Sequence, residues 1–480
     1  MLGKMSLSTQ FCDAQYWAQH HFGTVEVGDI RRRRRVCTLV AGWARQPGAS
    51  IPQLGAGVAY ASKAAYHLLS QPGVTPDVLQ APHRQLVYAQ LKQPGTYLLV
   101  EDTTQLRWSR STRPRPGLGP VAATKHAEQG VLLHSVVAAS WPGAPAALDD
   151  ARPAVALLGL LDQQYYVRPP APEAERTQLH GGSRPRQGRA RESSLWLQSL
   201  RQVGSPPPGS HWVVVADRGA DIYEHLLACQ QRGLGFVVRA CQDRGLVGTS
   251  QTIFALARAL PSAGKFALAI RSRPDRAARQ ATLHVSFSSP LLLRAPQRPG
   301  ISPQKGQPVA ASIVRVWEEG GTLKWLLLCE PGVLTFAQAR ERVWQYATRW
   351  LIEDFHKALK TGLGAERLQL HTAHRLFAAV ALLSVVALAL VDLREQSRQQ
   401  PDAPAEAAGL SLPFLQVLRQ QRRTLRTVRE VYYALAGLGG HLGRTGDGPP
   451  GWQTLWRGLV SLRQLVEGMR LAAGLSFQDA

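Results

Sequence analysis

The sequence predicts an α/β protein whose sheet-forming middle is flanked by helical regions. Short apolar runs such as Tyr97–Val100 and Trp212–Ala216 are typical of strands that are buried on both faces of a sheet. Before residue 92 and after Phe336, apolar residues recur at steps of three and four, which is the period of amphipathic helices. Residues 241–335 are instead rich in turns and β-forming runs. We therefore expect an α/β core interrupted by a mostly β insertion.

These changes in pattern divide the 480 residues into five segments. They are an N-terminal helical region (1–92), the first part of the core (93–240), the β insertion (241–335), the last part of the core with a Glu-bearing helix (336–395), and a linker with a C-terminal helical region (396–480). Core strands are predicted at 96–102, 130–140, 154–167, 211–216 and 235–240, with a Pro-, Gly- and Arg-rich loop at 168–189. The apolar run Leu376–Val391 is too short to span a membrane and is predicted to be a buried core helix.

The charge of the chain indicates a polyanionic partner. Lys and Arg number 56 against 33 Asp and Glu, which gives a net charge of +23. Nucleic acid explains this excess better than a membrane surface, because no basic amphipathic anchor helix is evident. A glycosidase could use paired carboxylates, but it would leave the charge unexplained. The five cysteines are scattered without a CxxC pair, and no signal peptide is evident, which favours the reducing cytoplasm and disfavours a zinc ribbon.

Two acidic residues follow predicted strands. Asp102 and Asp217 each end an apolar run, the position at which α/β sheets place their sites. An Asp after a strand can also cap a helix or make a turn. Asp221 is the better predicted cap of the helix that follows, which leaves Asp217 without that task. Together with Glu353 on a later helix, these carboxylates would repel one another unless a divalent ion such as Mg²⁺ or Mn²⁺ joined them. Two such ions can drive phosphodiester transfer.

The segment Trp344–Gly362 is predicted to be one amphipathic helix that ends at Gly362. Its polar stripe carries Tyr346, Arg349, Glu353 and Lys360, with His356 and Lys357 beside them. A solvated helix face with a few ion pairs would show the same pattern, so the stripe alone does not identify a site.

The spacing Tyr346-x2-Arg349-x3-Glu353-x6-Lys360 resembles the signature of the insertion-sequence-four type of bacterial DDE transposases. The segments "EDTTQL" and "VADRGADIYEHL" resemble that family's two Asp motifs, and "RWLIEDFHKALKTGLGAERLQL" resembles the third motif in its Tn-five group. Further similarity lies in "VGDIRRRRRV" and "SKAAYHLLSQPGVTPDVL" near one end and in "GLGGHLGRTGDGPPGWQTLWRGLVSLRQLVEGM" near the other. The resemblance therefore covers most of the chain, although Asp354 stands where close relatives have Glu.

This resemblance implies a ribonuclease-H-like core and cut-and-paste transposition by a homodimer that holds two transposon ends. It implies that Asp102, Asp217 and Glu353 bind Mg²⁺, replaceable by Mn²⁺, with two ions in each active site. It also implies contacts with double-stranded DNA, both the terminal repeats and the target. These would come from Arg31, Arg32, Arg35, Arg239, Tyr346, Arg349, His356, Lys357 and Lys360, with Trp325 stacking on a flipped-out base and Trp350 nearby. Core packing is the ordinary alternative for both tryptophans.

Two other functions stay open. One is a catalytically inactive protein or inhibitor that binds DNA ends, which the presence of all three carboxylates disfavours. The other is a different ribonuclease-H-like nuclease such as a junction resolvase, which the β insertion and the C-terminal region disfavour. In either case we expect the protein to act on DNA in the bacterial cytoplasm, with no membrane involved.

Overall fold

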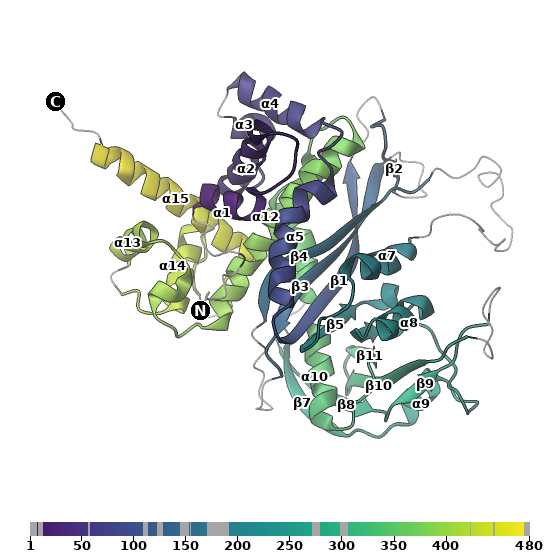
Figure 1. Cartoon of the computed structure of the whole chain (residues 1–480). Helices are drawn as coiled ribbons and strands as arrows, with labels where there is room; N and C mark the ends of the chain where they lie inside the picture. Colours follow the sequence, from purple (N-terminus) through teal and green to yellow (C-terminus); the bar gives the residue numbers. More distant parts are fainter. Residues whose placement is uncertain are drawn as a thin grey trace.

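The computed structural model of the chain describes residues 7, 13–55, 58–108, 114–121, 128–144, 153, 155–169, 192–270, 279–297, 306–422, 424–444 and 447–474. Most of the predicted Arg-rich loop (170–189) and Cys12 lie outside this part. A sheet of eleven strands runs through the molecule, and helices cover both of its faces (Figure 1). The predicted α/β class with helices at both ends is confirmed, and the architecture is consistent with the ribonuclease-H-like fold of a transposase.

The first half of the sheet mixes antiparallel and parallel pairs. β1 (Gly95–Trp108) lies between its antiparallel partner β3 (Gln129–Trp141) and its parallel partner β5 (Ser210–Ala216). β4 (Ala156–Tyr166) extends the sheet beyond β3, and β6 (Gly235–Arg239) runs parallel to β5. The parallel strands β1, β5 and β6 therefore point in the same direction.

The insertion continues this sheet instead of forming a separate one. β11 (Lys324–Cys329) pairs with β6, and the order continues through β10 (Val309–Glu318), β8 (Arg279–Phe287) and β7 (Gly264–Ile270). A helix, α9 (Ile253–Ala259), packs against β10. The insertion is thus mostly β, and its attachment to β6 places it beside the parallel strands.

Two short strands were not predicted from the sequence. They are β2 (Gly119–Pro120) beside β3 and β9 (Leu291–Leu293) beside β10. Two or three residues are too few to show a period-two pattern, so only their pairing with a longer strand defines them.

The two faces of the sheet bury separate apolar cores because side chains alternate along a strand. On β1, Leu98 and Val100 belong to the core shared with α12 (Ala373–Gln399). Tyr97 and Leu99 belong to the other core, which they share with α7 (Ser194–Val203) and α8 (Tyr223–Gln231).

The long apolar helix α12 passes through the middle of the protein. By length and composition it could cross a membrane, but 94% of its most apolar stretch is buried inside the protein. The predicted core helix at 376–391 is therefore confirmed. The helix continues to Gln399, so the linker predicted after residue 395 begins as helix and also contains the short turn η4 (Ala405–Ala408).

The N-terminal region consists of helices that lie against α12 and β4. They are α1 (Ala14–Phe22), α2 (Ile30–Arg45), α3 (Ile51–Leu54), α4 (Ala59–Leu69) and α5 (Pro76–Leu91). The buried Gln80 side chain on α5 donates to the side chain of Gln163 on β4 (2.9 Å) and to the carbonyl of Ala381 on α12 (3.0 Å). These bonds fix the N-terminal helices to the core.

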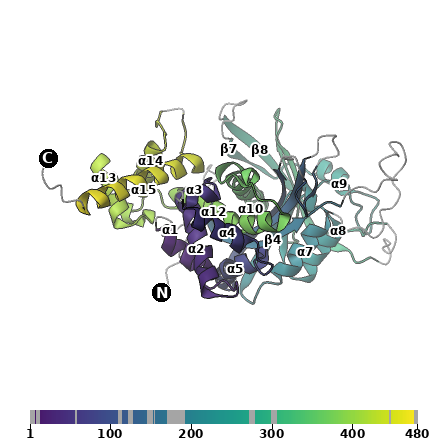
Figure 2. The same ribbon diagram turned by 90° about the horizontal axis from the view of Figure 1, so that it is seen from above.

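The C-terminal region contributes α13 (Leu412–Gln421), α14 (Val428–Leu438) and α15 (Trp452–Gly474). Figure 2 shows these helices and the sheet on opposite sides of the N-terminal helices. The far half of α15 exposes Leu465, Met469 and Leu471 to solvent.

The predicted single helix from Trp344 to Gly362 is interrupted in the structure. α10 (Phe336–Ala347) and α11 (Trp350–Lys357) are separated by a tighter turn, in which the Arg349 N–H donates to the Tyr346 carbonyl at 3.0 Å. The chain then continues as a π-helical turn, η2 (Ala358–Gly362), so the predicted end at Gly362 is correct. No Gly or Pro marks the break, so apolar periodicity could not reveal it.

Candidate active site

Three carboxylates from three different elements meet beside the end of β5. Asp102 belongs to β1, Asp217 directly follows β5, and Glu353 lies in the first turn of α11, which packs against β1. The register pairs Glu101 with Ala216, so Asp102 and Asp217 occupy neighbouring positions just beyond the parallel pairing. The sequence predicted that Asp102 ends its strand, and this prediction is wrong. β1 continues to Trp108, and beyond Glu101 it pairs with β3 alone.

The electrostatics of Asp102 show how close these groups are. Burial and the charges of Asp217 and Glu353 raise its pKa, Arg349 and the Thr103 N–H lower it, and the net result is a pKa of about 6. The Thr103 N–H donates to Asp102 Oδ1 at 2.8 Å. An acid that titrates near pH 6 for these reasons lies in a partly dry, negatively charged site.

Arg349 joins two of the three carboxylates. Its Nη1 lies 3.5 Å from Asp102 Oδ2, and its Nη2 contacts Glu353 Oε1. The Arg349 side chain is only 17% exposed, so this double contact is shielded from most of the solvent. The turn between α10 and α11 places Arg349 four residues before Glu353, where both side chains reach the same side of the helix.

The roles of two aspartates differ from the sequence analysis. Asp217 does cap a short helix, since its Oδ1 accepts from the Gly219 N–H at 2.7 Å at the start of η1 (Arg218–Ala220). Asp221 does not cap α8; its carboxylate accepts from the backbone N–H groups of Cys241 and Gln242, both at 2.7 Å. The cap geometry orients Asp217, and it is compatible with a place in the carboxylate cluster because the second oxygen is left for other partners.

Sequence reasoning missed a second cluster directly behind Asp102. Glu101 is buried on the opposite face of the sheet, with its Oε1 2.8 Å from Nε2 of His225 on α8 and its Oε2 3.6 Å from Nε2 of His134 on β3. The ring of Trp196 packs edge-on against both histidines. The period-two alternation of β1 could have placed Glu101 and Asp102 on opposite faces, but nothing local could have identified the histidines.

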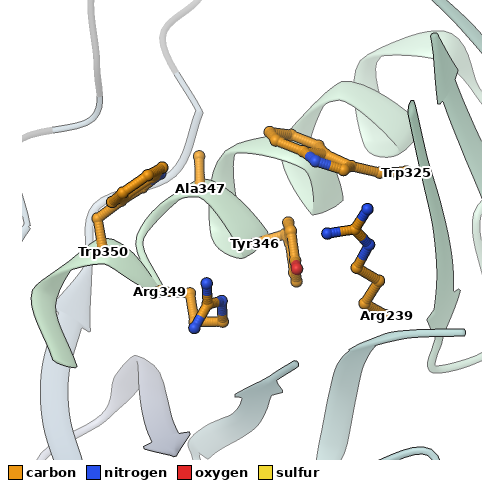
Figure 3. A pocket seen from close by; sticks show the side chains of 6 residues that line it. All are labelled: Arg239, Trp325, Tyr346, Ala347, Arg349 and Trp350. Carbon is orange, nitrogen blue, oxygen red and sulfur yellow. The ribbon is translucent and has the colours of Figure 1, made fainter. Parts of the chain in front are cut away.

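An open pocket of about 190 Å³ lies beside Arg349. It is lined by side chains from β6, β11, α10, α11 and the turn between these helices, namely Arg239, Trp325, Tyr346, Ala347, Arg349 and Trp350 (Figure 3). The Trp325 and Tyr346 rings meet edge to face at 5.2 Å, and Arg239 donates to the Lys324 carbonyl at 3.0 Å. Trp350 is 41% exposed. Five of the residues predicted to contact DNA are thus gathered in one pocket with both cationic and aromatic walls.

The other predicted residues of the helix are placed differently from one another. Lys357 is exposed, whereas His356 is buried, and burial together with the Lys360 charge lowers the pKa of His356 to about 3. His356 is therefore a neutral ring inside the protein, a placement that gives it no surface for DNA. Lys360 is half-buried in η2. Its pKa is lower than usual, mainly because of burial; the charge of Glu366 opposes this change and the charge of Arg107 adds to it.

The arginines of α2 divide into two kinds. Arg31 is exposed and Arg35 is half-buried. The Arg32 side chain donates to the Val27 carbonyl (3.4 Å) and contacts the Asp29 carboxylate (3.4 Å), and Arg33 Nε donates to the Val25 carbonyl at 3.1 Å. Arg32 and Arg33 thus brace the segment before α2, which leaves Arg31 as the more accessible of the three predicted contacts.

The donor chemistry of the site fits divalent ions, although the side chains are not arranged as a ready ligand set. Within the described residues, no group of three His, Cys, Asp or Glu side chains could hold a metal ion as it stands. The three carboxylates nevertheless supply hard oxygens, and their mutual repulsion at Asp102 is the setting that a cation stabilises. The described cysteines Cys37, Cys229, Cys241 and Cys329 are free thiols outside this cluster.

Comparison with known protein families gives a match near each end of the chain. Residues 14–74, which contain α1 to α4, match the transposase DNA-binding family model. Residues 416–478, which contain α14 and α15, match the model of the transposase Tn5 dimerisation domain. The chain therefore carries the regions for DNA binding and for homodimer formation, and together these matches support a Tn5-like transposase.

Proposed function

We propose that this protein is a DDE transposase of the insertion-sequence-four type, which cleaves the ends of its element and joins them to target DNA. The observation that carries the proposal is the convergence of Asp102, Asp217 and Glu353 beside a cationic and aromatic pocket. A protein with DNA-binding and dimerisation regions and a charge of +23 would attract the polyanion that such a site would act on.

The carboxylates are the proposed metal ligands. Asp102, Asp217 and Glu353 would hold two Mg²⁺ ions, for which Mn²⁺ can substitute, and these ions would activate the attacking water or 3′-hydroxyl and stabilise the leaving oxygen. The cap at Gly219 orients Asp217, and packing of α11 on β1 brings Glu353 close to Asp102. The fold itself would therefore bring the three carboxylates near one another before DNA arrives.

The pocket is proposed to hold the DNA strand next to the cleaved bond. Arg349 can grip a phosphate with two N–H groups, and the Tyr346 hydroxyl and Lys360 add single contacts. Trp325 offers a face on which a flipped base can stack, and Trp350 and Arg239 border the same space. Arg31 and Arg35 on α2, with Lys357 on α11, are the proposed contacts with the terminal repeats and their flanks; His356 is left out because it is buried.

Assembly is proposed to precede cutting. Two protomers would hold two ends, with the exposed Leu465, Met469 and Leu471 of α15 as part of the contact between protomers. The reaction would take place on DNA in the bacterial cytoplasm.

The test is cleavage of a duplex that carries the element's own terminal repeats. Purified protein with Mg²⁺ is expected to cut at the repeat boundary, and Glu353→Ala is expected to bind the duplex without cutting it. If the two proteins bind equally and neither cuts, the protein is an inactive end-binding protein and the proposed chemistry is wrong. If both cut, Glu353 is not a ligand.

A further inference from the structure

Arg349 stands at the boundary between the carboxylates and the pocket. Its guanidinium contacts Asp102 and Glu353, and the same side chain lines the pocket with Tyr346, whose ring centre lies 6.0 Å from the Arg349 guanidinium carbon. Figure 3 shows the guanidinium below the pocket, on the side of the strands. One side chain thus has access to two competing sets of anions.

The oxygens that Arg349 occupies are those that a metal ion would need. It contacts Oδ2 of Asp102 and Oε1 of Glu353, so these two carboxylates already have a cationic partner. A guanidinium satisfies two carboxylates at once because its donors form a rigid fork. One positive charge is nevertheless too little for three carboxylates, and the site keeps an affinity for further cation charge.

We propose that Arg349 makes metal loading depend on DNA. In the DNA-free protein it holds Asp102 and Glu353 and opposes their use as ligands, and a DNA phosphate in the pocket draws the guanidinium away and frees them. This inference rests on the proposed function. Because coupling between two ligands is reciprocal, bound metal also strengthens the grip on DNA.

The test measures Mn²⁺ binding to the full-length protein rather than cleavage. Titrations followed by electron paramagnetic resonance at about pH 8, where Asp102 is ionised, compare wild type with Arg349→Gln and Arg349→Lys. Each protein is measured alone and with a terminal-repeat duplex that lacks the 3′-hydroxyl at the boundary. Lys265→Gln is the matched control, since it removes one exposed positive charge from β7, which contributes no side chain to the carboxylate cluster or the pocket.

Without DNA, Arg349→Gln is expected to bind Mn²⁺ about tenfold more tightly than wild type, near the low end of known couplings between sites. Wild type should gain a similar factor when the duplex is added, whereas Arg349→Gln should gain little. Arg349→Lys should fall between the two, because a lysine can contact only one carboxylate well. Lys265→Gln should behave as wild type, and Asp217→Asn in the Arg349→Gln background should lose the tight binding.

The two failures are distinguishable. If DNA tightens Mn²⁺ binding to wild type but Arg349→Gln alone binds no more tightly than wild type alone, the dependence on Arg349 is wrong and the proposed function stands. If neither protein binds Mn²⁺ with or without DNA, the proposed metal chemistry fails and this inference falls with it. Equal gains in Arg349→Gln and Lys265→Gln would show a general charge effect and would also overturn the inference. Thermal melting of each variant verifies that it is folded.

Discussion

Two pairs of adjacent acidic residues, Glu101–Asp102 on β1 and Glu353–Asp354 on α11, show the same difference between neighbours. In each pair one carboxylate joins the cluster, and its neighbour is matched to a base elsewhere. Glu101 is buried between His134 and His225, and Asp354 pairs with Arg394 of α12 at 2.5 Å. The contrast shows that chemical type does not separate a reactive carboxylate from a structural one, whereas its partners do.

The pKa directions on β1 express this contrast. Burial alone would raise the pKa of Glu101, but His225 and His134 together bring it below its ordinary value. At Asp102, burial and the carboxylates of Asp217 and Glu353 outweigh Arg349 and raise the pKa to about 6. The folded protein therefore favours the ionised form of Glu101. Ionisation of Asp102 instead lowers the stability of the fold, as is common at functional sites.

The largest expected effect on stability is at Glu101. Glu101→Leu should lower the free energy of unfolding by about 3–5 kcal/mol, because it removes the central acceptor from a buried polar cluster and leaves both imidazoles without it. Urea denaturation measures the change. Glu128→Gln, at an exposed carboxylate next to Arg107, serves as the control and should melt as wild type does. A Glu101→Leu protein of wild-type stability would show that the histidine cluster is not structural.

At Asp102 the sign reverses. Asp102→Asn should raise the free energy of unfolding by about 1–3 kcal/mol near pH 8, because the ionised carboxylate is disfavoured in the folded state. The pKa is about 6 in the folded protein against an ordinary 3.8, so the cost of ionisation is complete above about pH 6 and disappears below about pH 4. Urea denaturation across this range should therefore show the advantage of the variant fade on acidification. An advantage that is constant with pH would contradict this origin.

The smallest expected effect is at Asp354. Asp354→Asn should cost about 1 kcal/mol, because Arg394 keeps its contact with Glu395 when this partner loses its charge. Cleavage should be unchanged, since Asp354 faces α12 and not the cluster. A loss of cleavage with intact folding would place Asp354 in the site instead.

Local patterns were enough for the architecture and for part of the site. The apolar runs ending near Asp102 and Asp217 and the polar stripe with Glu353 are properties of short segments, so period and spacing revealed them. The sequence did not reveal the break in the helix before Trp350 or the capping role of Asp217. Both depend on the local backbone geometry, which the residue types there do not determine. The run of β1 beyond Asp102 was missed because its pairing with β3 comes from a distant segment.

The partners of each carboxylate could not be predicted for a similar reason. His134 and His225 lie far from Glu101 in the chain and meet it only when β3 and α8 pack on β1. Arg394 likewise reaches Asp354 from α12. Alternation on a strand and the 100° step of a helix put adjacent residues on different faces, but they do not say which face becomes the site.

The most direct test of the account compares single-turnover cleavage of a terminal-repeat duplex by four variants with Mg²⁺. Asp102→Asn and Glu353→Gln should bind the duplex and fold normally but fail to cut it. Glu101→Gln, which keeps an acceptor between the histidines, and Asp354→Asn should cut at rates close to wild type. Cutting by Asp102→Asn at the wild-type rate, or its loss in a folded Asp354→Asn, would contradict the division of roles between the adjacent acids.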